Sequence, residues 1–385
     1  MTEHFPSARR RRLATALALG PLAALLSACA TSDPQPGREA ASASPYTPQA
    51  VLAAMERVAD WQLAHPSAHP ATDWTQGVGY TGFMALARVS GNPKYRDAML
   101  AMGNANGWKP GPNHYHADDH VVGQAYAELY LQLRDPKMIA GLRERFDDIL
   151  AHPRAGTLDF TVKGNQERWS WCDALFMAPP AWLRLWAATG DNRYFDFAVR
   201  EWWVTSDYLY DKDEHLYYRD SNAFARREAN GSKVFWGRGN GWVMGGLVRM
   251  LEYIPAGHPA RARFEQQYRE MAARIVGLQQ ADGLWRASLL DPASYPMKES
   301  SGSALYTYAL AWGVNAGLLD RATYEPAVRK AWIALAGNVN PDGRLTHVQP
   351  IGLAPKVFDE QATEVYGVGA FLLAGSEVVR LARRE

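Results

Sequence analysis

Two stretches of the sequence combine carboxylates with aromatic residues in a pattern suited to acid–base chemistry. The first, His114 to His120 (HYHADDH), precedes an apolar helical segment. The second, Arg168 to Pro180 (RWSWCDALFMAPP), sets one carboxylate, Asp173, among apolar and aromatic neighbours. Burial disfavours the charged form of a carboxyl group, so we expect Asp173 to hold its proton near neutral pH, as a general acid must.

Each of the two stretches also allows other interpretations. The first could hold a metal ion, but alternate spacing in an irregular loop does not bring several ligands to one side. Asp118 or Asp119 could instead cap the helix that follows, or point its carboxylate into a pocket. Asp173 could be an N-cap or the partner of Arg168 in a buried ion pair. The adjacent Cys172 has no feature that would ionise its thiol, so we do not expect it to act as a nucleophile.

A third stretch, Phe235 to Trp242 (FWGRGNGW), sets Arg238 between two tryptophans, with a glycine at every second position. An arginine suits two-pronged binding of a carboxylate, tryptophan faces stack on sugar rings, and glycines let the backbone approach a ligand. A phosphate-binding loop is the rival interpretation, but the spacing matches neither a P-loop nor a dinucleotide fingerprint. The stretch therefore favours a site for an acidic sugar.

The elements that must position these residues are predicted to be helices. Apolar periodicity, interrupted by short Gly, Pro and Asn breaks, indicates about twelve helical segments, with period-2 alternation only in stretches as short as 216–218. Six helix pairs predict an all-α domain closed into a double ring, because the fixed period of an open solenoid is not visible. The predicted helices are 49–65, 79–89, 94–106, 121–133, 136–151, 172–188, 192–209, 241–254, 260–279, 301–316, 324–335 and 364–382.

Residues 1–29 have the layout of an export signal: four arginines, an apolar run, and then Leu26-Ser27-Ala28-Cys29. These last four residues resemble the lipobox of bacterial lipoproteins, in which the cysteine carries the lipid. The arginine run also resembles a twin-arginine signal. We therefore predict an exported lipoprotein, periplasmic or anchored to the outer membrane, that contacts a membrane only through lipid on Cys29.

Composition bounds the rest of the chain. Residues 30–47 are rich in Ser, Ala and Pro and predict a flexible linker, which leaves 48–385 as the folded domain. The 41 basic and 40 acidic residues give a net charge of +1, which provides no basic stripe for nucleic acid. Of two cysteines, only Cys172 lies in the folded domain, so it has neither a partner for a disulfide there nor companions for a cysteine zinc site.

Four motifs, in order, resemble the unsaturated rhamnogalacturonyl hydrolases of glycoside hydrolase family 105, relatives of the unsaturated glucuronyl hydrolases of family 88. The motifs are Trp171 to Ala178, Trp236 to Trp242, Asp282 to Trp285 (DGLW) and Glu299 to Ala304 (ESSGSA). The resemblance implies an (α/α)6 barrel with no metal and no cofactor. It also implies a substrate with a 4,5-unsaturated uronic acid at its non-reducing end, made by a lyase from pectin-like or other uronate polysaccharides.

The resemblance also implies roles for individual residues. Asp173 matches the family's proton donor, which protonates C4 of the vinyl ether so that water adds at C5 and the product opens to release the next sugar. By its spacing to Gly123, Asp118 rather than Asp119 matches the second aspartate, which orients the sugar or water. The predicted substrate contacts are Asp119, His120, Trp171, Arg219, Trp236, Arg238 and Trp242. Many members carry a histidine at the position of Arg219, so here a second cation could serve the uronate or a neighbouring acidic unit.

Two other functions fit part of the sequence. A non-catalytic glycan-binding lipoprotein would keep the Trp and Arg residues of the third stretch but has no need of Asp173. Another (α/α)6 enzyme, such as a polysaccharide lyase, would use Tyr, His or Arg as proton carriers. A lyase creates ultraviolet absorbance as double bonds form, whereas the expected hydrolase removes it.

Overall fold

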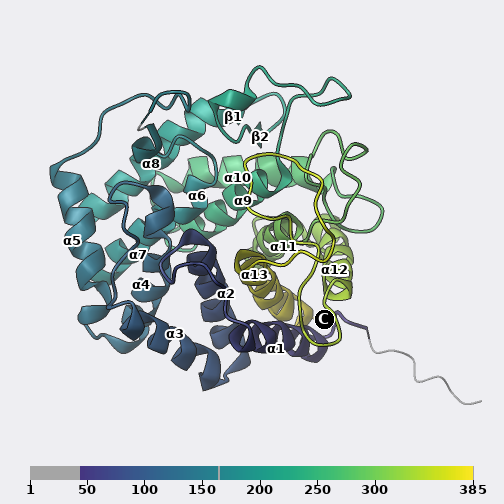
Figure 1. Ribbon diagram of the computed structural model, residues 1–385, viewed down its shortest axis with the longest axis horizontal. Coiled ribbons are helices and arrows are strands. Elements are labelled where there is room, and N and C mark those ends of the chain that lie inside the picture. Colours follow the sequence, from purple (N-terminus) through teal and green to yellow (C-terminus); the bar gives the residue numbers. More distant parts are fainter. Residues whose placement is uncertain (1–43, 164, 385) are drawn as a thin grey trace, which may run out of the picture. The chain divides into compact units, whose positions relative to one another are not determined.

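The structure is a computed structural model that describes residues 44–163 and 165–384. Twelve long helices and one single-turn helix, α6, make up most of these residues (Figure 1). Their bounds are α1 Pro48–Ala64, α2 Trp74–Ser90, α3 Pro93–Ala105, α4 Val122–Leu133, α5 Lys137–Ala151, α6 Ala174–Met177, α7 Pro179–Thr189, α8 Asn192–Leu209, α9 Gly237–Leu251, α10 Arg261–Val276, α11 Ser300–Asn315, α12 Arg321–Gly337 and α13 Val365–Ala382. The smaller elements are the strands β1 Tyr210–Asp211 and β2 Leu216–Tyr217 and the 3-10 turns η1 Ala117–His120, η2 Asn165–Arg168 and η3 Ser221–Ala223.

The long helices form two concentric rings. Helices α2, α4, α7, α9, α11 and α13 form the inner ring, in which each packs against the next and α13 packs against α2 to close it. Helices α1, α3, α5, α8, α10 and α12 surround them (Figure 1). Because inner and outer helices alternate along the chain, all six inner helices run in the same direction. The (α/α)6 barrel expected from the sequence is confirmed.

Closure of the inner ring depends on backbone contact between α2 and α13. A Cβ atom added to Gly82 would lie 2.5 Å from the carbonyl oxygen of Gly369, so the two helices approach too closely for any side chain there. Helix α13 is long and apolar enough to cross a membrane, but 94% of it is buried inside the domain. Its composition is that of an inner barrel helix surrounded by others.

The helix predictions hold with shifted ends. The segment expected as one helix over 172–188 is two, α6 and α7, because Pro179 and Pro180 lack the N–H groups that would continue α6. Helices α2 and α9 begin four to five residues earlier than their apolar periodicity indicates, since polar residues in their first turns face the barrel mouth and are buried there. The short hairpin expected near 216–218 is β1–β2.

The folded domain begins before the predicted boundary at residue 48. Tyr46 is 2% exposed, its ring lies under the guanidinium of Arg329, and the carbonyl of Pro45 accepts a hydrogen bond from the indole of Trp332. The linker predicted over 30–47 therefore overlaps the domain, because an aromatic anchor stands inside a stretch that composition alone marks as flexible. The predicted signal segment, 1–29 with Cys29, lies outside the described residues.

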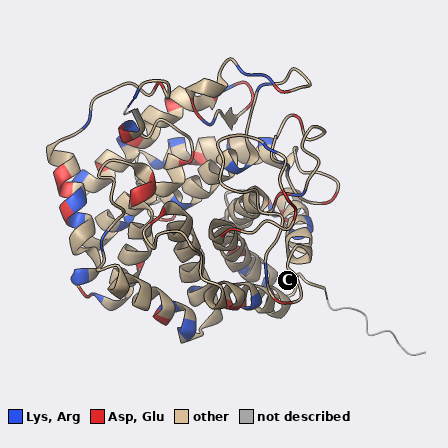
Figure 2. Ribbon diagram, in the orientation of Figure 1, with Lys and Arg blue, Asp and Glu red and all other residues tan. Residues whose placement is uncertain are grey.

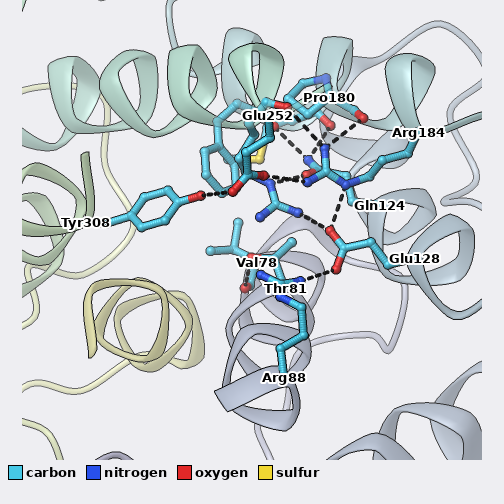
Figure 3. A network of polar contacts seen from close by, with 12 residues as sticks. Val78, Thr81, Arg88, Gln124, Glu128, Pro180, Arg184, Glu252 and Tyr308 are labelled. Carbon is cyan, nitrogen blue, oxygen red and sulfur yellow. Dashed lines mark hydrogen bonds and ion pairs between the residues drawn. The ribbon is translucent and has the colours of Figure 1, made fainter. Parts of the chain in front are cut away.

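Charged residues lie mainly on the surface, but several are buried, and one buried cluster links the inner helices. On the outer helices acidic and basic side chains alternate, as along α5 (Figure 2). Inside the barrel, toward the C-terminal ends of the inner helices, Glu128 of α4 binds three arginines (Figure 3). Its Oε1 accepts from Arg184 Nε at 2.7 Å and Arg249 Nη2 at 2.8 Å, and its Oε2 from Arg88 Nη1 at 2.9 Å. One carboxylate thus joins α2, α4, α7 and α9.

Replacing Glu128 with Gln should destabilise the fold, since it leaves buried guanidinium groups without their counter-charge. The three arginines lower the pKa of Glu128 to about 2 despite its burial. A carboxyl with a lowered pKa in the fold stabilises it above the unfolded pKa, and this contribution is lost as pH falls toward 2. We expect Glu128→Gln to lose about 3–5 kcal/mol of unfolding free energy at pH 7 in urea denaturation, with a smaller difference from wild type at pH 3.

The matched control is Asp207→Asn. Asp207 pairs with Arg263 on the surface, where both side chains are more than half exposed, so its loss should change the free energy by no more than about 1 kcal/mol. Equal effects of the two substitutions would contradict a structural role for the buried cluster.

Candidate active site

Asp173 lies at the end of the barrel where the inner helices begin. It holds the N-cap position of α6, but its φ and ψ of −61° and −30° are helical and its side chain makes no capping hydrogen bond. Its carboxyl is 8% exposed and has weak contacts: the Cys172 thiol 3.6 Å from Oδ2, and Arg219 Nε 3.5 Å from the same oxygen without a hydrogen bond. Neither structural interpretation of Asp173 holds: its side chain does not cap α6, and Arg168 forms its ion pair with Glu201.

Burial raises the pKa of Asp173 above its ordinary value, although the charges of Arg219 and Arg238 act in the opposite direction. Burial likewise raises the pKa of the Cys172 thiol well above its usual range, so this thiol stays protonated and is no nucleophile. The site therefore holds one carboxyl in an environment that favours its acid form.

A second carboxyl, Asp118, lies within electrostatic reach of the first. It stands in η1, just before α4, with 23% of its side chain exposed. Burial, and then the charge of Asp173, raise the pKa of Asp118 well above its ordinary value, while Arg219 opposes the shift. When two poorly solvated carboxyls lie within electrostatic reach, the negative charge of the first to ionise opposes ionisation of the second. One of the two is therefore favoured to keep its proton.

Asp119, the neighbour of Asp118, has a different environment. Its Oδ2 accepts a hydrogen bond from Asn113 Nδ2 at 3.1 Å, and its backbone carbonyl accepts one from the Gly111 N–H at 2.8 Å. A Cβ atom on Gly111 would overlap the Asp119 carboxylate, so the loop before η1 packs directly against it. These contacts make Asp119 a support for this loop and do not favour its predicted contact with substrate.

The histidines of the stretch His114 to His120 also differ in their environments. His120 is 1% exposed; its Nδ1 accepts from the indole N–H of Trp182 and its Nε2 lies 3.1 Å from the His114 carbonyl, so both ring nitrogens are used. Burial lowers the pKa of His120 to about 3. The predicted substrate contact by His120 is therefore not supported, since the ring belongs to the aromatic core.

His116, which the sequence reasoning did not single out, is the histidine near the carboxyls. Its ring lies against Trp171 with centroids 4.8 Å apart, and its Nδ1 is 3.8 Å from Asp118 Oδ2. Burial lowers its pKa, so the ring is neutral at neutral pH. The alternation of His114, Tyr115 and His116 was the available signal, because successive residues of an extended segment face opposite sides, which sets His116 opposite Tyr115.

The arginine of the third stretch binds protein backbone. Arg238 is 1% exposed, and its Nη1 and Nη2 donate to the carbonyls of Gln349 and Pro350 at 2.6 and 3.0 Å. Its guanidinium lies against the rings of Trp236 and Tyr366, with centroids 4.5 and 5.1 Å away. The two-pronged contact predicted for a sugar carboxylate is thus made to a loop 111 residues further along the chain.

Three predicted tryptophans surround the site without being widely exposed. Trp171 and Trp236 are each 2% exposed, and Trp236 donates its indole N–H to Gln349 Oε1. Trp242 is 1% exposed and packs between Trp74 and Phe176. The face of Trp236 covers the guanidinium of Arg238, so at least this ring is engaged by the protein itself.

Arg219 is the cation closest to the acid. Its Nη1 donates to Asp220 Oδ2 at 2.7 Å, while its Nε is buried without a hydrogen-bond partner beside Asp173. The carbonyl of Arg219 accepts a hydrogen bond from the Cys172 N–H at 2.8 Å, which ties the segment after β2 to the segment that carries the acid. The Nε of Arg238 is also buried without a hydrogen-bond partner, but of the two predicted cations Arg219 is the one that pairs with Asp173.

The remaining motif residue, Glu299, caps α11. Its carboxylate accepts hydrogen bonds from the N–H groups of Ser301 and Gly302, as a helix cap does. In the part of the chain that the structure describes, no three His, Cys, Asp or Glu side chains are grouped as metal ligands. The chemistry available from the described side chains is therefore proton transfer by Asp173 and Asp118 beside one cation.

Comparison with known proteins agrees with this geometry. Residues 49–382 match the model of Glycosyl Hydrolase Family 88. The chain is 42% identical over 344 residues to an unsaturated 3S-rhamnoglycuronyl hydrolase of Formosa agariphila, covering 86% of this chain and 91% of that one. It is 34% identical to a protein of the same name from an Alteromonas species, covering 84% of each.

A solved structure that bears the name polysaccharide lyase has the same fold. It is 32% identical, has a TM-score of 0.78, and covers 86% of this chain and 97% of its own. The two hydrolases match a similar share of this chain, and the one from Formosa agariphila is distinctly more similar to it in sequence than the structure named as a lyase is. The similarities therefore favour a hydrolase over the lyase considered from the sequence.

Asp173→Asn should stabilise the fold at neutral pH. A carboxyl whose pKa is raised by folding costs no stability at low pH, and its cost grows as pH rises above the unfolded pKa, because only the unfolded chain ionises it freely. We expect a gain of roughly 0.5–2 kcal/mol at pH 7, the range usual for removing an unfavourable site group, and none near pH 3. Thermal unfolding at both pH values measures it.

Asp220→Asn is the matched control, since Asp220 is similarly buried (5% exposed) but pairs with Arg219 and caps η3. This substitution should destabilise the protein at pH 7. If both variants lost stability, Asp173 would be a structural carboxylate like its neighbour.

Proposed function

The chain belongs to glycosyl hydrolase family 88, and we propose that Asp173 and Asp118 carry out its reaction. The protein is a hydrolase that removes an unsaturated uronic acid from oligosaccharides. The observation that supports these roles is a contrast among buried carboxyls. Glu128 is neutralised by three arginines and Glu299 caps a helix, whereas Asp173 and Asp118 lack strong partners and have raised pKa values.

In the proposed reaction, protonated Asp173 donates its proton to C4 of the vinyl ether. The double bond supplies the electron pair for the new C4–H bond, and the positive charge that develops at C5 is shared with the ring oxygen. Water then adds to C5 and gives up a proton to the carboxylate that remains. The resulting hemiketal opens by breaking the bond between C5 and the ring oxygen, which gives a ketone at C5 and leaves a hemiacetal at C1. This hemiacetal then collapses to the aldehyde and releases the next sugar with a free hydroxyl.

Asp118 is proposed to orient the sugar or the attacking water. The charge of Asp173 acts on Asp118, and the side chain of Asp118 is open enough to accept a hydrogen bond from a ligand. Because one group serves first as acid and then as base, the pair need not have the spacing of the acid and nucleophile in retaining glycosidases. Neutral His116, next to Asp118, would help to hold that carboxyl in place.

We propose an unsaturated uronic acid linked to a rhamnose with a sulfate at O3 as the substrate. Both hydrolases described above carry the name 3S-rhamnoglycuronyl hydrolase. Arg219 supports a substrate with more negative charge than a single uronate, since it adds a cation where many family 105 members have histidine. The sugar would derive from a sulfated uronate polysaccharide already cut by a lyase.

We also propose that the protein is exported and held at a membrane, in the periplasm or at the outer membrane, by lipid on Cys29, which stands in the lipobox-like sequence Leu26 to Cys29. Full-length protein expressed in a bacterium should fractionate with membranes and label with radioactive palmitate, whereas Cys29→Ser should do neither. Labelling of both would contradict lipidation at Cys29. Wild-type protein in the soluble fraction without label would contradict anchoring altogether.

The catalytic proposal predicts loss of ultraviolet absorbance when the purified protein meets the right lyase-made disaccharide. The panel contains unsaturated uronates linked to 3-sulfated rhamnose, plain rhamnose, and a hexosamine. Asp173→Asn should lower kcat by at least about 1000-fold, because no other described group replaces the donor, and Asp118→Asn by about 100-fold or more. Asp119→Asn is the control and should keep kcat within about threefold of wild type.

An increase in absorbance on uncut polysaccharide would identify a lyase. Binding of a disaccharide in calorimetry without any absorbance change would identify a glycan-binding protein. An active Asp173→Asn variant would overturn the assignment of the acid.

A further inference from the structure

A small cavity adjoins the proposed acid and is bordered by two arginines. It has a volume of about 80 Å³, and its lining includes Phe160, Arg219, Arg226, Val234, Trp236 and Leu353. Arg219 connects it to the site, since the Nε of that residue lies 3.5 Å from Asp173 Oδ2. A group bound in this cavity would therefore sit next to a sugar at Asp173.

The two arginines have different environments. Arg219 lies deep, is paired with Asp220, and covers the face of Phe160 with its guanidinium 4.8 Å from the ring centroid. Arg226 lies further out and is exposed, and its side chain forms no hydrogen bond or ion pair with any residue between 44 and 384 that the structure describes. Its charge is available to a ligand.

The backbone fixes the position of Arg226 relative to Arg219. Asp220 binds Arg219 with Oδ2 and caps the η3 turn with Oδ1, which accepts from the Asn222 N–H at 2.8 Å. The N–H of Arg226 in turn donates to the Ala223 carbonyl, the last residue of η3, at 3.1 Å. One carboxylate thus orients the inner arginine and the turn that carries the outer one.

The rest of the lining combines aliphatic side chains with the polar Asn222 and with Asp220, which is paired with Arg219, and the cavity opens under an apolar rim. Val234, Leu353 and Ala354 contribute its aliphatic surface. Leu353 is 58% exposed, and Ile351 and Val357 in the same loop are 51% and 60% exposed. A ligand that joins negative charge to a methyl group matches Arg226 and the aliphatic part of this lining, while Asn222 is available to hydrogen-bond a hydroxyl of the same sugar.

We propose that this cavity is the subsite for the leaving sugar and that Arg226 binds its sulfate ester. This inference rests on the proposed function, in which the leaving sugar is a sulfated rhamnose. The substrate then has two negative groups, and the two cations lie at different depths: Arg219, the deeper one, beside the uronic acid and Arg226, the outer one, beside the sulfate. The C6 methyl of the rhamnose faces Val234 and Leu353.

The test compares two disaccharides that differ only in the sulfate at O3 of the rhamnose. Arg226→Gln should raise KM for the sulfated disaccharide by about tenfold or more, as expected for losing a hydrogen bond to a charged group. It should leave kcat for that substrate, and both constants for the desulfated one, within about twofold of wild type. Arg226→Lys should recover part of the loss, because it keeps the charge without the two-pronged geometry.

Arg227→Gln is the matched control. Arg227 is the next residue and equally exposed, but its guanidinium donates to the backbone carbonyls of Phe224 and Arg226 and does not line the cavity. This variant should match wild type on both substrates. If Arg226→Gln raised KM for the two disaccharides equally, or for neither, the subsite assignment would be wrong while the proposed function stood. A wild-type protein inactive on both would overturn the proposed substrate, and the subsite with it.

Discussion

The contact between α2 and α13 that closes the inner ring is the constraint on which the site depends. Because Gly82 and Gly369 allow the two backbones to touch, six helices can share one axis without a gap. All six then begin at the same end of the barrel. The partial positive charges of their N-termini are added there, which favours a negatively charged substrate at the end where Asp173 and Asp118 lie. An open array of the same hairpins would spread these residues along a surface.

Burial in this barrel has opposite consequences for different carboxyls. Glu128 is surrounded by arginines, so its negative charge is stabilised and it links four inner helices at the far end of the barrel. At the mouth, burial raises the pKa values of Asp173 and Asp118 more than the nearby arginine charges lower them, so their acid forms are favoured. The two buried acids at the mouth thus lower the free energy of unfolding, whereas the Glu128 cluster at the other end raises it.

The mouth is built by contacts between segments far apart in the sequence. Trp236 and Arg238 donate hydrogen bonds to Gln349 and Pro350, so the loop between α12 and α13 is held against the start of α9. The same loop carries Leu353 to the cavity beside Arg219. A residue that resembles a ligand contact, Arg238, therefore shapes the site by positioning a loop, and Arg219 is the cation paired with Asp173.

The sequence by itself determined the helices and the presence of a carboxyl in an apolar setting. Periodicity and composition are local properties, so twelve helical segments and the unusual context of Asp173 could be predicted without coordinates. Only the tertiary structure decided which residues interact. Asp118 is influenced by the charge of Asp173, whereas Asp119 binds Asn113, and His116 lies near the carboxyls, whereas His120 belongs to the core. Likewise, Arg238 binds backbone carbonyls, whereas Arg219 lies beside Asp173. The reason is that adjacent side chains in a single turn point in directions fixed by what packs around them, and those partners lie up to 112 residues away.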